Sequence, residues 1–229
     1  MQDVLLIIDL QNGVCQTNDQ TIDHLSELLL FVNQRIQRYR KEEKPVIFVQ
    51  HEEETLPYGS KAWQLHPALA YEPTDRLIRK KHANSFFQTD LQAVLQTNQV
   101  RSIEFAGAQT EYCLDGTIKF THGLGYQNVV YAQATTTYPS RGRSAAEIID
   151  WYEMIWQGRF AEVLANPQMK KSDFLLTRRS FSSKVLFNKN NESVEKESNR
   201  GYFKERLWLV ERVKSEAMKN GLGGLIVDK

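Results

Sequence analysis

The stretch VLLIID, residues Val4–Asp9, decides the fold: a short, unbroken apolar run that ends in an acid. A run of this kind predicts a strand buried on both faces, as in a parallel sheet covered by helices. The same pattern returns in PVIFVQ, Pro45–Gln50, and in SIEFAG, Ser102–Gly107. Between the first two runs, apolar residues recur at helical spacing from Asp19 or Thr21 to about Lys41. The chain therefore begins as strand, helix, strand.

Strand and helix continue to alternate, which predicts an α/β fold: a three-layer α/β/α arrangement with a mostly parallel sheet and helices on both faces. Further strands are expected at Arg76–Ile78, Asn128–Ala132 and Asp173–Leu176. Further helices are expected from Thr89 to about Thr97, from Cys113 to His122 before Gly123 and Gly125, and from Ser144 to Trp156.

The last part of the chain differs in composition from the rest. We expect one domain over residues 1–178 and a basic linker with an amphipathic helical tail over residues 179–229. Ser180–Arg200 is rich in Ser, Asn, Lys and Glu, as linkers are, and Tyr202–Lys219 carries an apolar stripe. That stripe predicts docking on the domain or on a second subunit, and a homo-oligomer (dimer or tetramer).

Composition excludes several classes of protein. The 229 residues include 29 basic and 28 acidic ones, a net charge of +1, so no overall field attracts nucleic acid or an anionic membrane. The apolar runs are far shorter than the roughly 20 residues that span a bilayer, and no basic region precedes the first of them. Cys15 and Cys113 form no CxxC pair, which argues against a disulfide framework. We expect a cytoplasmic protein without nucleic-acid or membrane partners.

Chemistry is expected where the strands end, because open parallel sheets bind ligands beyond their carboxyl ends. Asp9 follows the first strand, Lys80 and Lys81 follow the third, and Cys113 follows the fourth after a short turn. An ammonium and a helix start favour the thiolate, and a carboxylate can move the thiol proton. Backbone N–H groups at the turn can bind an oxyanion. The three groups suit nucleophilic catalysis.

Three segments of the sequence resemble the isochorismatase-like cysteine hydrolases. Asp9-Leu-Gln-Asn-Gly13 resembles their D-x-Q-N opening. Lys80-x4-Ser85-Phe86-x2-Thr89 resembles their lysine segment, and Gly107-Ala-Gln-Thr-Glu-Tyr-Cys113 resembles their nucleophile segment. The three motifs occur in the family's order and cover roughly residues 3–165.

The resemblance implies roles for individual residues. Cys113 would be the nucleophile, Asp9 the general base and acid, and Lys80 the third member of the triad; counting from a Lys-His pair would select Lys81 instead. The family's non-proline cis peptide would fall at Ala108–Gln109, directing the N–H groups of Gln109 and Cys113 toward an oxyanion. Cys15 is expected to pack or to line the pocket rather than to act as a second nucleophile.

No metal or other cofactor is expected. Relatives that hydrolyse nicotinamide carry an Asp-x-His after the second strand, and here the acid position is Val49, before His51. His66 could be the further histidine, yet two histidines without the carboxylate make a poor metal site. We therefore expect packing or pocket-lining roles for both.

The residues expected to contact substrate lie in loops near the same edge: Gln11, Gln50, Trp63, Phe86 and Tyr112. Aromatic walls with amide groups suit a small planar amide or an enol ether. The first hypothesis is a hydrolase that cleaves a C–N bond of a small amide or ureide through a Cys thioester. The alternatives are isochorismatase-type vinyl-ether hydrolysis, in which the aspartate protonates the substrate, and a non-catalytic α/β binding module.

Overall fold

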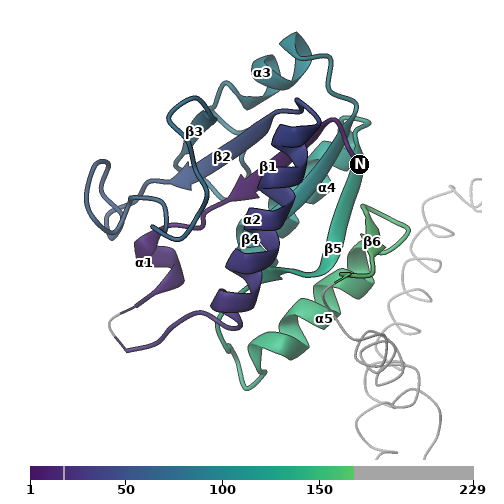
Figure 1. Ribbon diagram of the computed structural model, residues 1–229. Coiled ribbons are helices and arrows are strands. Elements are labelled where there is room, and N and C mark those ends of the chain that lie inside the picture. Colours follow the sequence, from purple (N-terminus) through teal and green to yellow (C-terminus); the bar gives the residue numbers. More distant parts are fainter. Residues whose placement is uncertain (18, 168–229) are drawn as a thin grey trace, which may run out of the picture. The chain divides into compact units, whose positions relative to one another are not determined.

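The computed structural model describes residues 1–17 and 19–167 (Figure 1). They form a six-stranded parallel sheet in the order β3-β2-β1-β4-β5-β6. The strands are β1 (Val4–Ile8), β2 (Val46–His51), β3 (Arg76–Lys80), β4 (Ser102–Ala108), β5 (Gln127–Thr136) and β6 (Glu162–Leu164). The helices are α1 (Asn12–Cys15), α2 (Leu25–Lys41), α3 (Leu91–Thr97), α4 (Asp115–Gly123) and α5 (Ala145–Trp156), with a π-helical turn at Thr110–Leu114.

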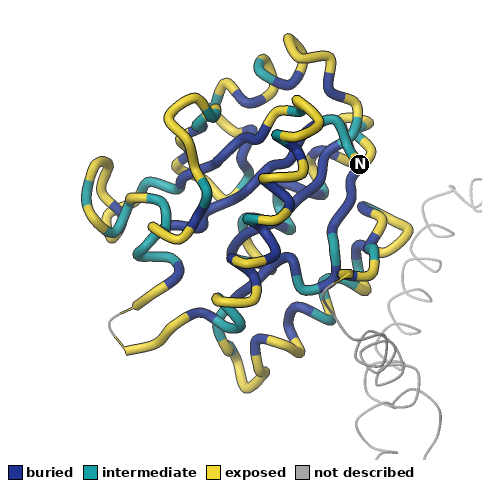
Figure 2. Tube along the Cα trace, viewed as in Figure 1, coloured by how far each residue is buried: buried dark blue, intermediate teal, exposed yellow. Residues whose placement is uncertain are grey.

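Strand β1 is the centre of the core. All five of its residues are buried, and it pairs with β2 on one side and β4 on the other. In Figure 1, α2 crosses in front of the sheet and α4 lies behind it, and Figure 2 shows the strands between them as buried. Removing apolar side chains from water on both faces stabilises the sheet, which confirms the α/β fold predicted from the unbroken apolar runs.

Several element boundaries follow the sequence prediction closely. Helix α5 begins after Ser144, whose hydroxyl accepts a hydrogen bond from the Glu147 N–H, while the Glu147 carboxylate accepts one from the Ser144 N–H. This capping box satisfies two N–H groups that the first turn of a helix leaves free. Helix α2 ends at Lys41 as expected but begins only at Leu25, because His24 has a left-handed backbone conformation (φ 36°).

The sheet differs from the prediction at its far edge. The sixth strand lies at Glu162–Leu164, directly after α5. The strand expected at Asp173–Leu176 and the tail expected at 179–229 lie outside the described residues. None of the helices in the described part of the chain has the length and apolar character needed to cross a bilayer.

The strand order places a crevice at the centre of the sheet. The order reverses between β1 and β4, and such a switch point is where open α/β sheets bind ligands. The two strands approach closely here: a Cβ on Gly107 would lie 2.0 Å from the Ile8 carbonyl oxygen, so only glycine fits. Asp9 and the segment after Ala108 therefore flank the same opening.

Candidate active site

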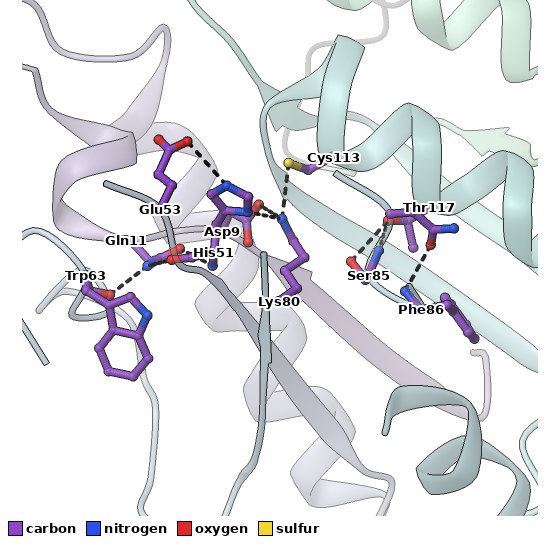
Figure 3. Close-up of polar contacts among 11 residues, drawn as sticks. Asp9, Gln11, His51, Glu53, Trp63, Lys80, Ser85, Phe86, Cys113 and Thr117 are labelled. Carbon is purple, nitrogen blue, oxygen red and sulfur yellow. Dashed lines mark hydrogen bonds and ion pairs between the residues drawn. The ribbon is translucent and has the colours of Figure 1, made fainter. Parts of the chain in front are cut away.

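Asp9 is the first residue after β1. It is 2% exposed and has a positive φ of 54°, a conformation that non-glycine residues rarely adopt. Its N–H donates to the Val49 carbonyl oxygen at 2.9 Å, which ties the end of β1 to β2. Unusual backbone conformations in buried residues are typical of functional sites, and the Asp9 carboxylate lies against the Lys80 ammonium (Figure 3).

Lys80 ends β3, and its side chain is completely buried. Its Nζ lies 2.6 Å from Asp9 Oδ2 and 3.2 Å from Cys113 Sγ, between the two groups (Figure 3). Lys81 points to solvent: its side chain is 70% exposed and pairs with Glu52 at 3.4 Å. Adjacent residues on a strand face opposite ways, so only Lys80 reaches Asp9 and Cys113.

Cys113 lies in the segment that follows β4. The peptide bond between Ala108 and Gln109 is cis, and the π-helical turn that contains Cys113 comes next, before α4. Sequence analysis predicted a helix starting at Cys113, but helical periodicity does not distinguish a π turn from the first turn of an α-helix. A hydrogen bond of 3.0 Å between the hydroxyls of Thr110 and Thr135 links the turn to β5.

The protonation state of the thiol differs from the expectation that it rests as a thiolate. Burial, together with the charge of Asp9, raises the pKa of the Cys113 thiol to about 12, although the Lys80 ammonium opposes this shift. For Lys80, burial lowers the pKa, but Asp9 and Cys113 raise it further, so the net direction is upward. At neutral pH the arrangement is a thiol beside a carboxylate and an ammonium.

Three of the residues expected to contact substrate also contact one another. The Gln11 amide donates to the carbonyl oxygens of His51 and Trp63 and accepts from the His51 N–H. Gln50 also donates to the Trp63 carbonyl, at 2.8 Å. The Trp63 indole packs against Tyr58, with ring centroids 4.9 Å apart. The Gln11 amide is therefore occupied by main-chain groups rather than free for substrate, and these contacts attach the loop after β2 to β1.

Phe86 and Tyr112 lie in different surroundings. Phe86 is 7% exposed, and its ring packs against Phe120 and Tyr126. It therefore packs with the core, and its predicted contact with substrate stays a prediction. Tyr112, next to Cys113 on the π turn, is 54% exposed. Of the aromatic side chains expected in the pocket, Tyr112 is the one placed beside the thiol and open to solvent.

Two hydroxyls that sequence analysis gave no role connect the lysine segment to the nucleophile segment. The Thr117 hydroxyl on α4 accepts from the Ser85 N–H at 3.1 Å and lies 3.0 Å from the Ser85 hydroxyl (Figure 3). Both residues are buried. Ser85 belongs to the quoted lysine segment, which is the one signal in the sequence, but its contact with Thr117 depends on how α4 packs.

The histidines do not form a metal site. His51 Nδ1 lies 3.0 Å from Lys80 Nζ, and His66 Nδ1 accepts from the Ala68 N–H. Val49 provides no ligand where a carboxylate would be needed. Across residues 1–17 and 19–167, no three His, Cys, Asp or Glu side chains are grouped to hold a metal ion. Cys15 is fully buried, and burial raises its pKa to about 12, which fits a packing role.

A parallel sheet with a polar cluster buried at its switch point is typical of an α/β enzyme. The isochorismatase domain, a family of hydrolases, matches residues 3–151. The isochorismatase family protein YddQ of Bacillus subtilis (strain 168) is 28% identical over 144 residues, which are 60% of this chain and 80% of YddQ.

Solved structures agree with this match. The crystal structure of an isochorismatase family protein is 46% identical, with a TM-score of 0.69, over 70% of this chain and 96% of the other. A cysteine hydrolase from Pseudomonas syringae pv. phaseolicola 1448A shares the fold, with 20% identity and a TM-score of 0.67 over 79% of this chain and 93% of that one. The chain belongs to the isochorismatase family and is a hydrolase, as the sequence motifs predicted.

Proposed function

We propose that the protein hydrolyses a C–N bond of a small amide or ureide through a thioester on Cys113, with Asp9 and Lys80 completing a triad. One observation carries the proposal: Lys80 Nζ joins Asp9 Oδ2 and Cys113 Sγ, at 2.6 and 3.2 Å, in a buried site at the switch point of the sheet. A thiol has no use in acid-catalysed vinyl-ether cleavage, whereas amide hydrolysis requires a nucleophile.

The first half-reaction forms the thioester. Cys113 Sγ attacks the carbonyl carbon while its proton passes to Asp9, because a thiol whose pKa is raised to about 12 needs a base at the moment of attack. The N–H groups of Gln109 and Cys113 bind the oxyanion. Asp9 then returns the proton to the nitrogen as the C–N bond breaks, and the amine or ammonia leaves.

The second half-reaction releases the acid. Asp9 takes a proton from water as the water oxygen attacks the thioester carbon. As the C–S bond breaks, Asp9 passes this proton to Cys113 Sγ, which restores both the thiol and the carboxylate. Lys80 stays protonated throughout, since the charge of Asp9 holds its pKa above the usual range against the effect of burial. Its ammonium stays paired with the Asp9 carboxylate between the two steps.

The test is a panel of small amides and ureides, read by ammonia release, with wild type and Cys113→Ala. We expect wild type to release ammonia from at least one compound and Cys113→Ala to release none, with an unchanged melting temperature because little volume is lost. If Cys113→Ala keeps more than a few per cent of the rate, the thioester is refuted, and isochorismatase-type vinyl-ether hydrolysis becomes the better assignment.

We further propose that the full chain works as a homo-oligomer, a dimer or tetramer, in the cytoplasm. Both cysteines are free thiols, the state that the proposed chemistry requires and that a reducing compartment maintains. The apolar stripe in 179–229 motivates the oligomer. Light scattering on the full chain should give two or four times 26.6 kDa, and a monomer mass contradicts the proposal.

A further inference from the structure

A fourth side chain contacts the buried ammonium. His51 ends β2 directly opposite Lys80 in the parallel register, and its Nδ1 lies 3.0 Å from Lys80 Nζ (Figure 3). An ammonium has three N–H groups. Lys80 has three acceptors at hand: Asp9 Oδ2, Cys113 Sγ and His51 Nδ1. The ammonium therefore faces one partner for each of its N–H groups, and turning it away from any of them would lose that contact.

Gln11 holds the main chain of His51, and Glu53 faces its ring. Gln11 Oε1 accepts from the His51 N–H at 2.7 Å, and Gln11 Nε2 donates to the His51 carbonyl oxygen at 2.9 Å. On the ring, Nε2 faces Glu53 Oε2 at 3.5 Å. To accept from Lys80 at Nδ1, the ring must be neutral with its proton on Nε2, and the Glu53 carboxylate favours that tautomer.

We propose that His51 is a positioning residue: through Nδ1 it holds the Lys80 ammonium in the one orientation that bridges Asp9 and Cys113. The inference rests on the proposed function, since the bridge matters only if these two groups exchange a proton. His51 need not touch substrate, and its effect acts through Lys80.

The charges that face His51 come from three segments: Lys80 on β3, Asp9 after β1, and Glu53 in the loop after β2. Burial and the Lys80 charge lower the pKa of His51, and the two carboxylates oppose them only partly. At neutral pH the ring is therefore neutral and can accept. In acid, protonation removes the acceptor and places a second cation beside Lys80, so activity should fall as His51 titrates.

Two variants separate the acceptor from the ring. His51→Leu removes the acceptor and should lower kcat by about 10- to 100-fold with KM nearly unchanged, the effect of losing one hydrogen bond to a charged group. His51→Asn offers an oxygen near the position of Nδ1 and should recover most of kcat. Asn does not titrate. The His51→Asn variant should therefore keep its activity in the acid range where protonation of His51 lowers the activity of wild type. Equal kcat loss in both variants, or an acid limb unchanged in His51→Asn, overturns the proposal.

If no compound in the panel is turned over, that result counts against the proposed function alone. The contact between His51 and Lys80 can still be tested by a measurement that needs no substrate. Nitrogen-15 NMR of labelled histidines, with the His51 signal identified from its absence in His51→Asn, should show the neutral Nε2–H tautomer at pH 7. Lys80→Met removes the neighbouring charge at similar volume and should raise the His51 pKa. A proton on Nδ1, or a His51 pKa that Lys80→Met leaves unchanged, contradicts the assignment.

Discussion

The protein buries two clusters of charge in the same sheet, and they are built differently. Arg35 on α2 reaches Glu104 on β4 with two hydrogen bonds of 2.6 Å, and the Tyr39 hydroxyl adds a third at 2.9 Å. Asp9, on the neighbouring strand end, pairs with Lys80 through one oxygen, and its Oδ1 has no hydrogen-bond partner among the described residues. The first carboxylate is fully satisfied, whereas the second keeps capacity for a proton.

This difference separates a structural ion pair from one that can do chemistry. Both oxygens of Glu104 are engaged, and the pair lies under α2, where the side chains are at most 7% exposed. Asp9 and Lys80 lie beside a thiol at the switch point of the sheet. A satisfied buried pair resists change in protonation, while a partly satisfied one can take and return a proton at the cost of stability. The two clusters should therefore respond oppositely to mutation.

The largest expected effect is on activity at the second cluster. Asp9→Asn should lower kcat/KM by about 100- to 10,000-fold, because the amide cannot carry the proton in either half-reaction. Lys80→Ala should be no more damaging. Lys81→Ala is the matched control and should stay within about twofold, as a solvent-exposed change does. Steady-state kinetics on a substrate from the panel measures kcat/KM for all three variants. A large loss of kcat/KM in Lys81→Ala would mean that Lys81, rather than Lys80, serves the site.

The next effect is on stability at the first cluster. Glu104→Gln leaves the Arg35 charge buried without its partner and should cost about 3–5 kcal/mol, with activity per folded molecule unchanged. Thermal unfolding should show a fall in Tm on the order of 10 °C. Adding Arg35→Met to Glu104→Gln should recover part of the loss. If Glu104→Gln loses as much activity per folded molecule as Asp9→Asn does, the two clusters are not separate in function.

A smaller effect concerns the thiol in the free enzyme. Since burial and Asp9 raise its pKa to about 12, alkylation of Cys113 by iodoacetamide should accelerate about tenfold per pH unit from pH 7 to 10. Peptide mass spectrometry distinguishes Cys113 from the buried Cys15. A rate that levels off near neutral pH would show a preformed thiolate and remove the need for Asp9 as base.

The smallest expected effect is that of metal removal, which should leave the activity unchanged. Val49 replaces a carboxylate, and the Nδ1 atoms of His51 and His66 already have partners. Dialysis against a strong chelator should leave the rate unchanged. If activity is lost and zinc or iron restores it, His51 and His66 bind a metal ion. The contact between His51 and Lys80 would then not exist in the active enzyme.

Sequence patterns predicted what local periodicity encodes. β1, β2 and β4 were found because unbroken apolar runs mark strands buried on both faces, and the start of α5 was found from its capping residues. The three residues of β6 are too few to form a pattern. The contact between His51 and Lys80 depends on the register of β2 against β3, which neither strand specifies alone.

In the site, too, local sequence predicted some features, while others depend on tertiary packing. The three motif residues Asp9, Lys80 and Cys113 do lie together, because β1, β3 and β4 all end at the same edge of the sheet. The sequence did not predict that Gln11 attaches a loop or that Phe86 packs in the core, and their contact with substrate stays a prediction. Their neighbours are set by tertiary packing, and a single sequence gives residue type but not the direction in which a loop side chain points.

The most direct test of the account is to trap the thioester. Wild type mixed with a substrate and quenched in acid within the first turnovers should gain the mass of the acyl group without the amine, and peptide mapping should place it on Cys113. Cys113→Ala should show neither adduct nor turnover. Turnover by Cys113→Ala, with wild type free of adduct under the same quench, would contradict covalent catalysis at this cysteine.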